Sequence, residues 1–161
     1  MTKRLFLMAL LVASILMLTS CSLPTLLFSV PSTIVNGQQT AATVQLLNAP
    51  AVAQVQFTVG VSSYSLATAG ALPSLAFSAV PGPSNQLTCV VPAGGGGYQC
   101  TATPLAGSAT LPSGVIATFN LIVNNAGPGT AAPSVTGISA TDAGGTPVSL
   151  ATITPLSVTL Q

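Results

Sequence analysis

Apolar and polar side chains alternate along two stretches of the chain. Between positions 53 and 61 the odd-numbered residues are apolar, and Gln54, Gln56 and Thr58 lie between them. Between positions 115 and 123 the odd-numbered residues are again apolar, from Val115 to Val123. A period of two residues is that of a β-strand with one buried face. Both stretches are therefore predicted to be strands whose odd positions face the core.

The other strand candidates are short runs rich in Val, Thr, Leu and Ile. They are Leu26–Val30, Thr40–Leu47, Leu75–Val80, Gln86–Val91, Tyr98–Thr103, Ser134–Thr141, Val148–Ile153 and Leu156–Leu160. The 15 glycines and 13 prolines interrupt the chain too often for long helices. Turn signals such as Asn36-Gly37 between short strands are typical of a sandwich. We predict an all-β, two-sheet antiparallel sandwich of about nine strands in one domain, with residues 124–133 as its most linker-like interval.

Charge is almost absent, because the whole chain has 2 basic residues, 1 acidic residue and no histidine. Lys3 and Arg4 lie at the N-terminus and Asp142 lies near the other end. General acid–base or nucleophilic catalysis needs titratable partners, and metal sites need several ligands. Nucleic-acid binding needs a cationic surface. We therefore expect no enzyme, no cofactor, no metal and no nucleic-acid partner, and we interpret Asp142 as a turn residue that bonds its own backbone.

The N-terminus has the layout of a secretory signal. A short basic segment precedes residues 5–18, which are apolar apart from Ser14. A membrane-spanning helix needs about 20 apolar residues, so this run is too short to span. We expect residues 1–20 to be a signal peptide that directs export.

The segment Leu18-Thr19-Ser20-Cys21 resembles the lipobox of bacterial lipoproteins. The resemblance implies that Cys21 is lipidated and becomes the new N-terminus, with residues 21–25 as a tether and residues 26–161 as the folded domain. In the lipoprotein family, an aspartate directly after the cysteine is associated with retention at the inner membrane. This chain has Ser22 at that position instead. The resemblance therefore implies an anchor in the cell envelope, at the outer membrane.

Cys89 and Cys100 remain as an even pair in an exported chain. Each lies in a strand-like run, and residues 92–97, which include four glycines, join the two runs. A hairpin would place the two cysteines opposite each other, which predicts a structural disulfide. The alternative, a redox site, would need a cationic neighbour or a helix N-terminus, and neither is visible in the sequence.

Four segments in order resemble cohesin and cohesin-like modules. They are Val52–Tyr64, Gly114–Val123, Val135–Val148 and Leu156–Leu160, and the turn Ala140–Pro147 is the most specific among them. The resemblance covers about residues 25–161 and implies a nine-stranded jelly-roll β-sandwich related to cellulose-binding modules. Cohesins bind dockerins, which are small calcium-loaded modules on other secreted proteins. The resemblance thus implies an extracellular, non-catalytic binding module.

The candidate binding face consists of Gln54, Gln56, Thr58, Tyr64 and Tyr98. The chain departs from the cohesin pattern here, because Val61-Ser62-Ser63 stands where cohesins have a Tyr-Asp-Pro-like stretch and the face has no charge. Three partners stay open. A dockerin-like protein follows from the resemblance, and a polysaccharide, as in systems of polysaccharide catabolism, would use the two tyrosines because there is no tryptophan.

The third alternative is a self-assembling structural lipoprotein of the surface, since neutral strands rich in Thr, Ser, Val and Ala favour association at sheet edges. Two simpler interpretations compete with a binding face. Gln54, Gln56 and Thr58 would then be the solvated side of a strand, and Tyr98 would cover the disulfide.

Overall fold

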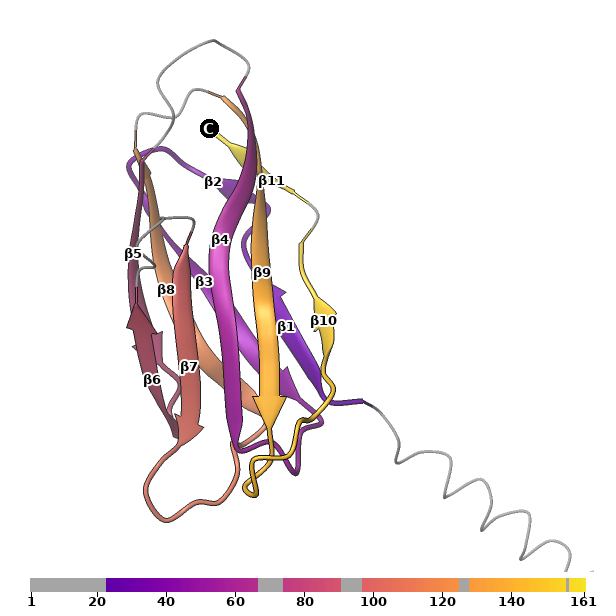
Figure 1. The fold of residues 1–161 in the computed structure, drawn as a ribbon. Coiled ribbons are helices and arrows are strands. Elements are labelled where there is room, and N and C mark those ends of the chain that lie inside the picture. Colours follow the sequence, from indigo (N-terminus) through magenta and orange to yellow (C-terminus); the bar gives the residue numbers. More distant parts are fainter. Residues whose placement is uncertain (1–22, 67–73, 91–96, 125–127, 156) are drawn as a thin grey trace, which may run out of the picture.

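The computed structural model describes residues 23–66, 74–90, 97–124, 128–155 and 157–161. The predicted signal peptide and Cys21 lie outside these residues. In the described part all regular structure is β, and two sheets pack face to face (Figure 1). The all-β sandwich is therefore confirmed. None of the described residues forms a helix long and apolar enough to cross a membrane.

The first sheet has five strands in the order β10-β1-β3-β8-β5. Their bounds are β1 Thr25–Ser29, β3 Gln39–Leu47, β5 Ser74–Pro81, β8 Gly114–Asn124 and β10 Ala151–Ile153. The second sheet has six strands in the order β2-β11-β9-β4-β7-β6. Their bounds are β2 Thr33–Ile34, β4 Gln54–Leu66, β6 Asn85–Val90, β7 Tyr98–Pro104, β9 Gly129–Thr141 and β11 Val158–Leu160.

Eleven strands are described where about nine were expected from the pattern. The strand that the sequence analysis missed is β2, which is only two residues long and exists because Leu160 pairs with Ile34. Two of the pairs, β1 with β10 and β2 with β11, are parallel, and the other pairs are antiparallel. Each parallel pair lies at one edge of its sheet, so the strands in the middle of both sheets pair antiparallel.

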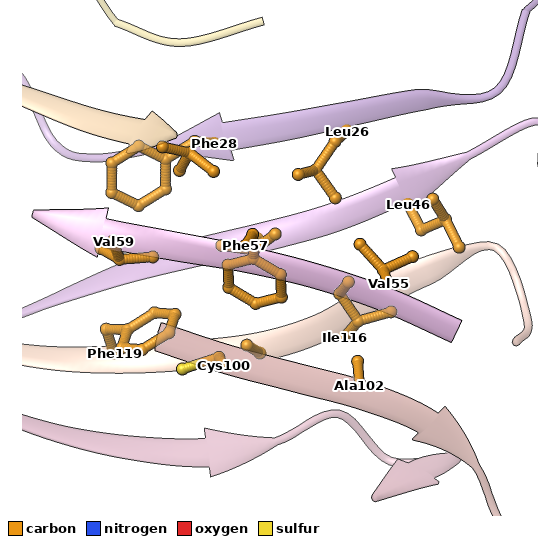
Figure 2. Close-up of a cluster of buried hydrophobic side chains, with 14 of the residues drawn as sticks. Leu26, Phe28, Leu46, Val55, Phe57, Val59, Cys100, Ala102, Ile116 and Phe119 are labelled. Atoms are coloured by element: carbon orange, nitrogen blue, oxygen red, sulfur yellow. The ribbon is translucent and has the colours of Figure 1, made fainter. Parts of the chain in front are cut away.

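The core lies between the sheets, as the alternation along β4 predicts. Val55, Phe57 and Val59 are each at most 1% exposed. The ring of Phe57 packs edge to face against the ring of Phe119, which belongs to the opposite sheet (Figure 2). The ring centroids are 6.3 Å apart and the ring planes are at 85° to each other, which is a favoured aromatic geometry. Ala53 precedes the strand and is half-buried.

The alternation predicted for residues 115–123 breaks at a β-bulge. Val44 pairs with Ala117, but the next residue, Gln45, pairs with Val115, so Ile116 is the extra residue of β8. A bulge shifts the following side chains to the other face. Ile116 is therefore fully buried while Val115 is only half-buried, and the expectation that Val115 faces the core was wrong. The side chains of Leu121 and Val123 lie outside the described residues.

A second correction concerns the interval that looked like a linker. Residues 129–133 form the first part of β9, and Pro133 is buried opposite Val61. Proline cannot donate a ladder hydrogen bond and is tolerated inside a sheet at bulges. The pairing of β4 with β9 has such an irregularity between Val61 and Ser63. The local irregularity explains why a strand runs through a sequence that reads as a turn.

The carbonyl oxygen of Ile116 at the bulge accepts two hydrogen bonds. The backbone N–H of Gly82 donates one at 3.1 Å, and Nδ2 of Asn85 donates the other at 2.9 Å. Asn85 is the buried polar residue of the described part, at 3% exposed. The Asn85 bond ties the beginning of β6 to β8 of the other sheet, and the Gly82 bond holds the segment between β5 and β6 to the same carbonyl.

Candidate binding face

The cross-strand disulfide joins Cys89 of β6 to Cys100 of β7. The two residues are directly opposite each other in the antiparallel register, with Cα atoms 4.1 Å apart. Cys100 is fully buried and Cys89 is half-buried against the core. The predicted disulfide is confirmed, and its position on the inner side of the sheet agrees with a structural role.

The three polar residues of β4 point away from the core. Gln54, Gln56 and Thr58 alternate with the buried Val55, Phe57 and Val59, which places them on the outer face of the six-stranded sheet. They are half-buried because β4 lies between β7 and β9. A half-buried position restricts a side chain more than free solvent does, so these groups stand at defined places on a sheet surface.

The pairing register extends this surface across four strands. Gln56 lies between Thr101 of β7 and Ser139 of β9, and Thr58 lies between Gln99 and Thr136. Side chains directly opposite each other on one face are about 5 Å apart. We call the combined surface the neutral face. Its residues are Gln54, Gln56 and Thr58 of β4, Gln99 and Thr101 of β7, Thr136 and Ser139 of β9, and Gln86 and Thr88 of β6.

The neutral face carries amides and hydroxyls and no charge. Oγ of Ser139 donates a long hydrogen bond of 3.5 Å to Oε1 of Gln56, which links β9 to β4. Its members outside β4 were missed from the sequence alone. The alternation of polar residues along 86–88 and 99–103 could have indicated that these strands also have a polar outer face. Only the strand register shows which of the residues are neighbours.

Gly137 keeps the neutral face open beside Thr58. The register between β4 and β9 shifts between Gln56 and Thr58, so β9 has an extra residue there. Gly137 adopts φ 58°, the left-handed conformation that glycine takes in such bulges. A Cβ at this position would lie 3.5 Å from Oγ1 of Thr58. Any larger side chain would therefore cover the threonine hydroxyl.

Of the two tyrosines, Tyr98 lies outside the neutral face. Tyr98 is on the same side of β7 as Cys100 and packs, half-buried, against the core. The expectation that it shares a face with Gln56 was wrong, because Gln99 and Thr101 take the outward positions of that strand. The alternative interpretation, in which Tyr98 covers the disulfide, agrees with this inward position. Tyr64 pairs with Ala131, and its side chain lies outside the described residues.

Asp142 closes the turn after β9, next to the pair of Thr141 with Gln54. Its Oδ1 accepts hydrogen bonds of 2.8 Å from the backbone N–H groups of Gly144 and Thr146. The bond from the Thr146 N–H is the main cause that lowers the pKa of this carboxyl, against a smaller opposing effect of desolvation. The interpretation of Asp142 as a turn residue is confirmed. The described residues contain no group of three His, Cys, Asp or Glu side chains that could hold a metal ion.

The fold is similar to that of solved cohesin modules. A non-cellulosomal cohesin from the archaeon Archaeoglobus fulgidus matches with a TM-score of 0.62 at 17% identity, over 86% of this chain and 90% of its own. The cohesin module of a family 33 glycoside hydrolase from Clostridium perfringens matches with a TM-score of 0.65 at 12% identity, over 87% and 98%.

A third match is a chain of a type II cohesin–X-dockerin complex from Acetivibrio cellulolyticus, with a TM-score of 0.60 at 12% identity, over 86% of this chain and 99% of that one. No protein-family model and no curated protein matches the sequence. At these identities the similarity shows the fold. The chain therefore has a cohesin-like β-sandwich.

Proposed function

We propose that this chain is a lipid-anchored, non-catalytic binding module of the cell envelope that holds a protein partner on the neutral face. The observation that carries the proposal is the neutral face itself, an ordered array of amides and hydroxyls on the outer face of a cohesin-like sheet. One of the similar structures is a cohesin–X-dockerin complex. A dockerin-like partner is therefore the first candidate.

The chemistry of the neutral face favours a protein over a polysaccharide. Sugar-binding surfaces usually present flat aromatic rings. Among the aromatic residues whose side chains the structure describes, Phe28, Phe57 and Phe119 are buried in the core and Tyr98 is on the inner side of its strand. Glutamine and threonine instead offer donors and acceptors that match the backbone and side chains of a folded partner.

The test is capture from the host's own envelope and secreted proteins. The chain, purified from the envelope in mild detergent, is immobilised and incubated with these fractions with and without a calcium chelator. A dockerin-like partner is expected to be captured and to be lost on chelation. Capture of polysaccharide instead, or of no partner at all, would contradict the proposal.

Two matched variants locate the contact. Gln56→Arg puts a long charged side chain on the neutral face, and Gln45→Arg puts the same side chain at a half-buried outward position of β3 in the other sheet. Gln56→Arg is expected to abolish capture while Gln45→Arg retains it. Equal melting temperatures of the two variants would show that both are folded. Loss of capture in both variants, or in neither, would exclude the neutral face as the contact.

The lipid anchor at Cys21 has its own test. Cys21→Ser is expected to remove incorporation of labelled fatty acid and to release the chain from the membrane fraction, whereas Ser22→Ala retains both. We place the anchor at the outer membrane, so separation of inner and outer membranes is the measurement for location. Labelling of the Cys21→Ser chain would contradict the anchor.

A further inference from the structure

Within the described part of the chain, strand β6 forms an unprotected edge of the six-stranded sheet. It pairs with β7 on one side and ends the sheet on the other. The other edge strands are β2 with two residues, β10 with three residues and β5, which ends in Pro81. Proteins protect their edges by short strands, prolines, bulges or charged side chains. β6 has six residues, Asn85–Val90, with no proline and no charge.

The position of the disulfide shows which backbone groups of β6 point towards the open edge. The Cα atoms of Cys89 and Cys100 are 4.1 Å apart, which is the spacing of a pair that does not exchange ladder hydrogen bonds. Such pairs alternate along an antiparallel ladder, so Leu87, opposite Ala102, is also of this kind. The N–H and C=O groups of Leu87 and Cys89 therefore point away from β7, towards the open edge.

The side chains around this edge are apolar or neutral. Val90 at the end of β6 is 54% exposed, and Val80 in the neighbouring edge strand β5 is 47% exposed. Figure 1 shows β5 and β6 together at the same side of the sandwich. The disulfide fixes β6 to β7, so little further ordering is needed when another strand pairs with it.

We propose that β6 pairs antiparallel with β6 of a second copy of this chain, which joins the two six-stranded sheets into one. In this register Leu87 of each copy exchanges backbone hydrogen bonds with Cys89 of the other. The two copies of Thr88 then lie opposite each other on the two-fold axis. Because this contact uses the same strand in both copies, it closes as a dimer and does not continue into a filament.

Three features favour a second copy as the partner of β6. The strand supplies both the donors and the acceptors that a copy of itself needs in the antiparallel register. Opposed like charges, which would separate two identical edges, are missing from Asn85–Val90. Gln86 would lie opposite Val90 and Thr88 opposite Thr88, so the neutral face would continue across the dimer. The contact uses the edge of the sheet and does not depend on the function proposed above.

The test is the mass of the chain, purified in mild detergent, by light scattering over a range of concentrations. The wild-type chain is expected to change from one to two protein copies per particle as concentration rises. Thr88→Lys and Thr88→Glu would each place like charges together on the two-fold axis, and each alone is expected to remain monomeric. An equimolar mixture of the two is expected to restore the two-copy particle, because Lys then faces Glu.

Gln99→Lys is the matched control. Gln99 is exposed on the same face but belongs to β7, one strand away from the edge, opposite Val90. This variant is expected to form dimers like the wild type. A wild-type chain that stays monomeric at every concentration would overturn the proposal. Dimers formed by Thr88→Lys alone would also overturn it. So would an equimolar mixture of Thr88→Lys and Thr88→Glu that remains monomeric while Gln99→Lys forms dimers.

Discussion

At the scale of single residues, the described part of the molecule uses its few strong hydrogen-bonding groups to close places where the strands are irregular. Asn85 donates to the carbonyl of the β8 bulge, and Asp142 accepts from two backbone N–H groups of the turn after β9. A buried polar atom that loses its partner costs more than an exposed one. We therefore expect the two residues to respond differently to substitution.

Asn85→Ala is expected to lower the free energy of unfolding by about 1–3 kcal/mol, because it removes one of the two donors to the Ile116 carbonyl. Asn85→Asp has the same shape but no donor at that atom, so it is expected to be at least as destabilising. Gln86→Ala, at the exposed neighbouring position, is the control. Denaturant unfolding measures all three, and equal effects at both positions would contradict the role of Asn85.

Asp142 is expected to make the stability of the fold depend on pH in acid. Because hydrogen bonds lower the pKa of its carboxyl in the folded state, its contribution is complete above the ordinary carboxyl range and is lost as the pH falls through the lowered value. The chain contains no His or Glu. The melting temperature is therefore expected to be constant from neutral to mildly acidic pH and to fall only in stronger acid.

Asp142→Asn is the control for this effect, since the amide oxygen can accept the same two bonds but does not titrate. The melting temperature of Asp142→Asn is expected to fall much less in acid than that of the unsubstituted chain. Asp142→Ala removes the acceptor and is expected to be less stable at every pH. An acid decrease of the same size in Asp142→Asn as in the unsubstituted chain would assign the pH dependence elsewhere.

At the scale of elements, the bulges in β8 and β9 decide which side chains face the core. Each inserts one residue and shifts the alternation that follows. In β8 the result is that Ile116 takes the buried position expected for Val115. In β9 the bulge near Gly137 puts Ile138 on the inner side and Thr136 and Ser139 on the neutral face. The composition of the neutral face therefore depends on backbone irregularities.

The β8 bulge predicts an inverted order of mutational effects. Ile116→Ala is expected to destabilise the fold by about 2–5 kcal/mol, since it leaves a cavity in a packed core. Val115→Ala, at a half-buried position, is expected to cost clearly less. Strict alternation would predict the reverse order, so the two unfolding free energies discriminate directly between the bulged and the regular strand.

The disulfide is expected to stabilise the hairpin of β6 and β7. The bond closes a loop of 11 residues in sequence separation, for which loss of denatured-state entropy predicts about 3 kcal/mol of stabilisation. Reduction is expected to lower the melting temperature of the wild-type chain. The double variant Cys89→Ala, Cys100→Ala is expected to melt at the lower temperature with or without reductant. A melting temperature unchanged by complete reduction would contradict this contribution.

At the scale of the whole molecule, the scarcity of charge determines how it can associate. The complete chain has a formal net charge of +1, and removal of residues 1–20 would leave Asp142 as the single charged side chain. Long-range steering and ionic-strength dependence both arise from charge. The contacts proposed for the neutral face and for the edge of β6 would therefore rely on hydrogen bonds and apolar contacts at short range.

Association is accordingly expected to be insensitive to salt. The rate at which the chain captures a partner, and its own dimerisation, should change little between low and high sodium chloride. Gln99→Lys supplies a reference, because an added charge on the same face introduces a salt dependence if the partner carries charge. A rate for the wild-type chain that falls steeply with salt would show that charge steers the encounter after all.

The strand periodicity, the turn residues and the paired cysteines were sufficient to predict an all-β sandwich, the disulfide hairpin and the turn at Asp142. These features are local, because alternation and turn chemistry act between near neighbours in sequence. The sequence could not show that Ile116 replaces Val115 or that residues 129–133 continue a strand, and it left open which side of its strand Tyr98 takes. Bulges and register are set by packing between strands far apart in sequence, as where Gln56 lies between Thr101 and Ser139. The neutral face and the open edge of β6 therefore exist only in the folded molecule.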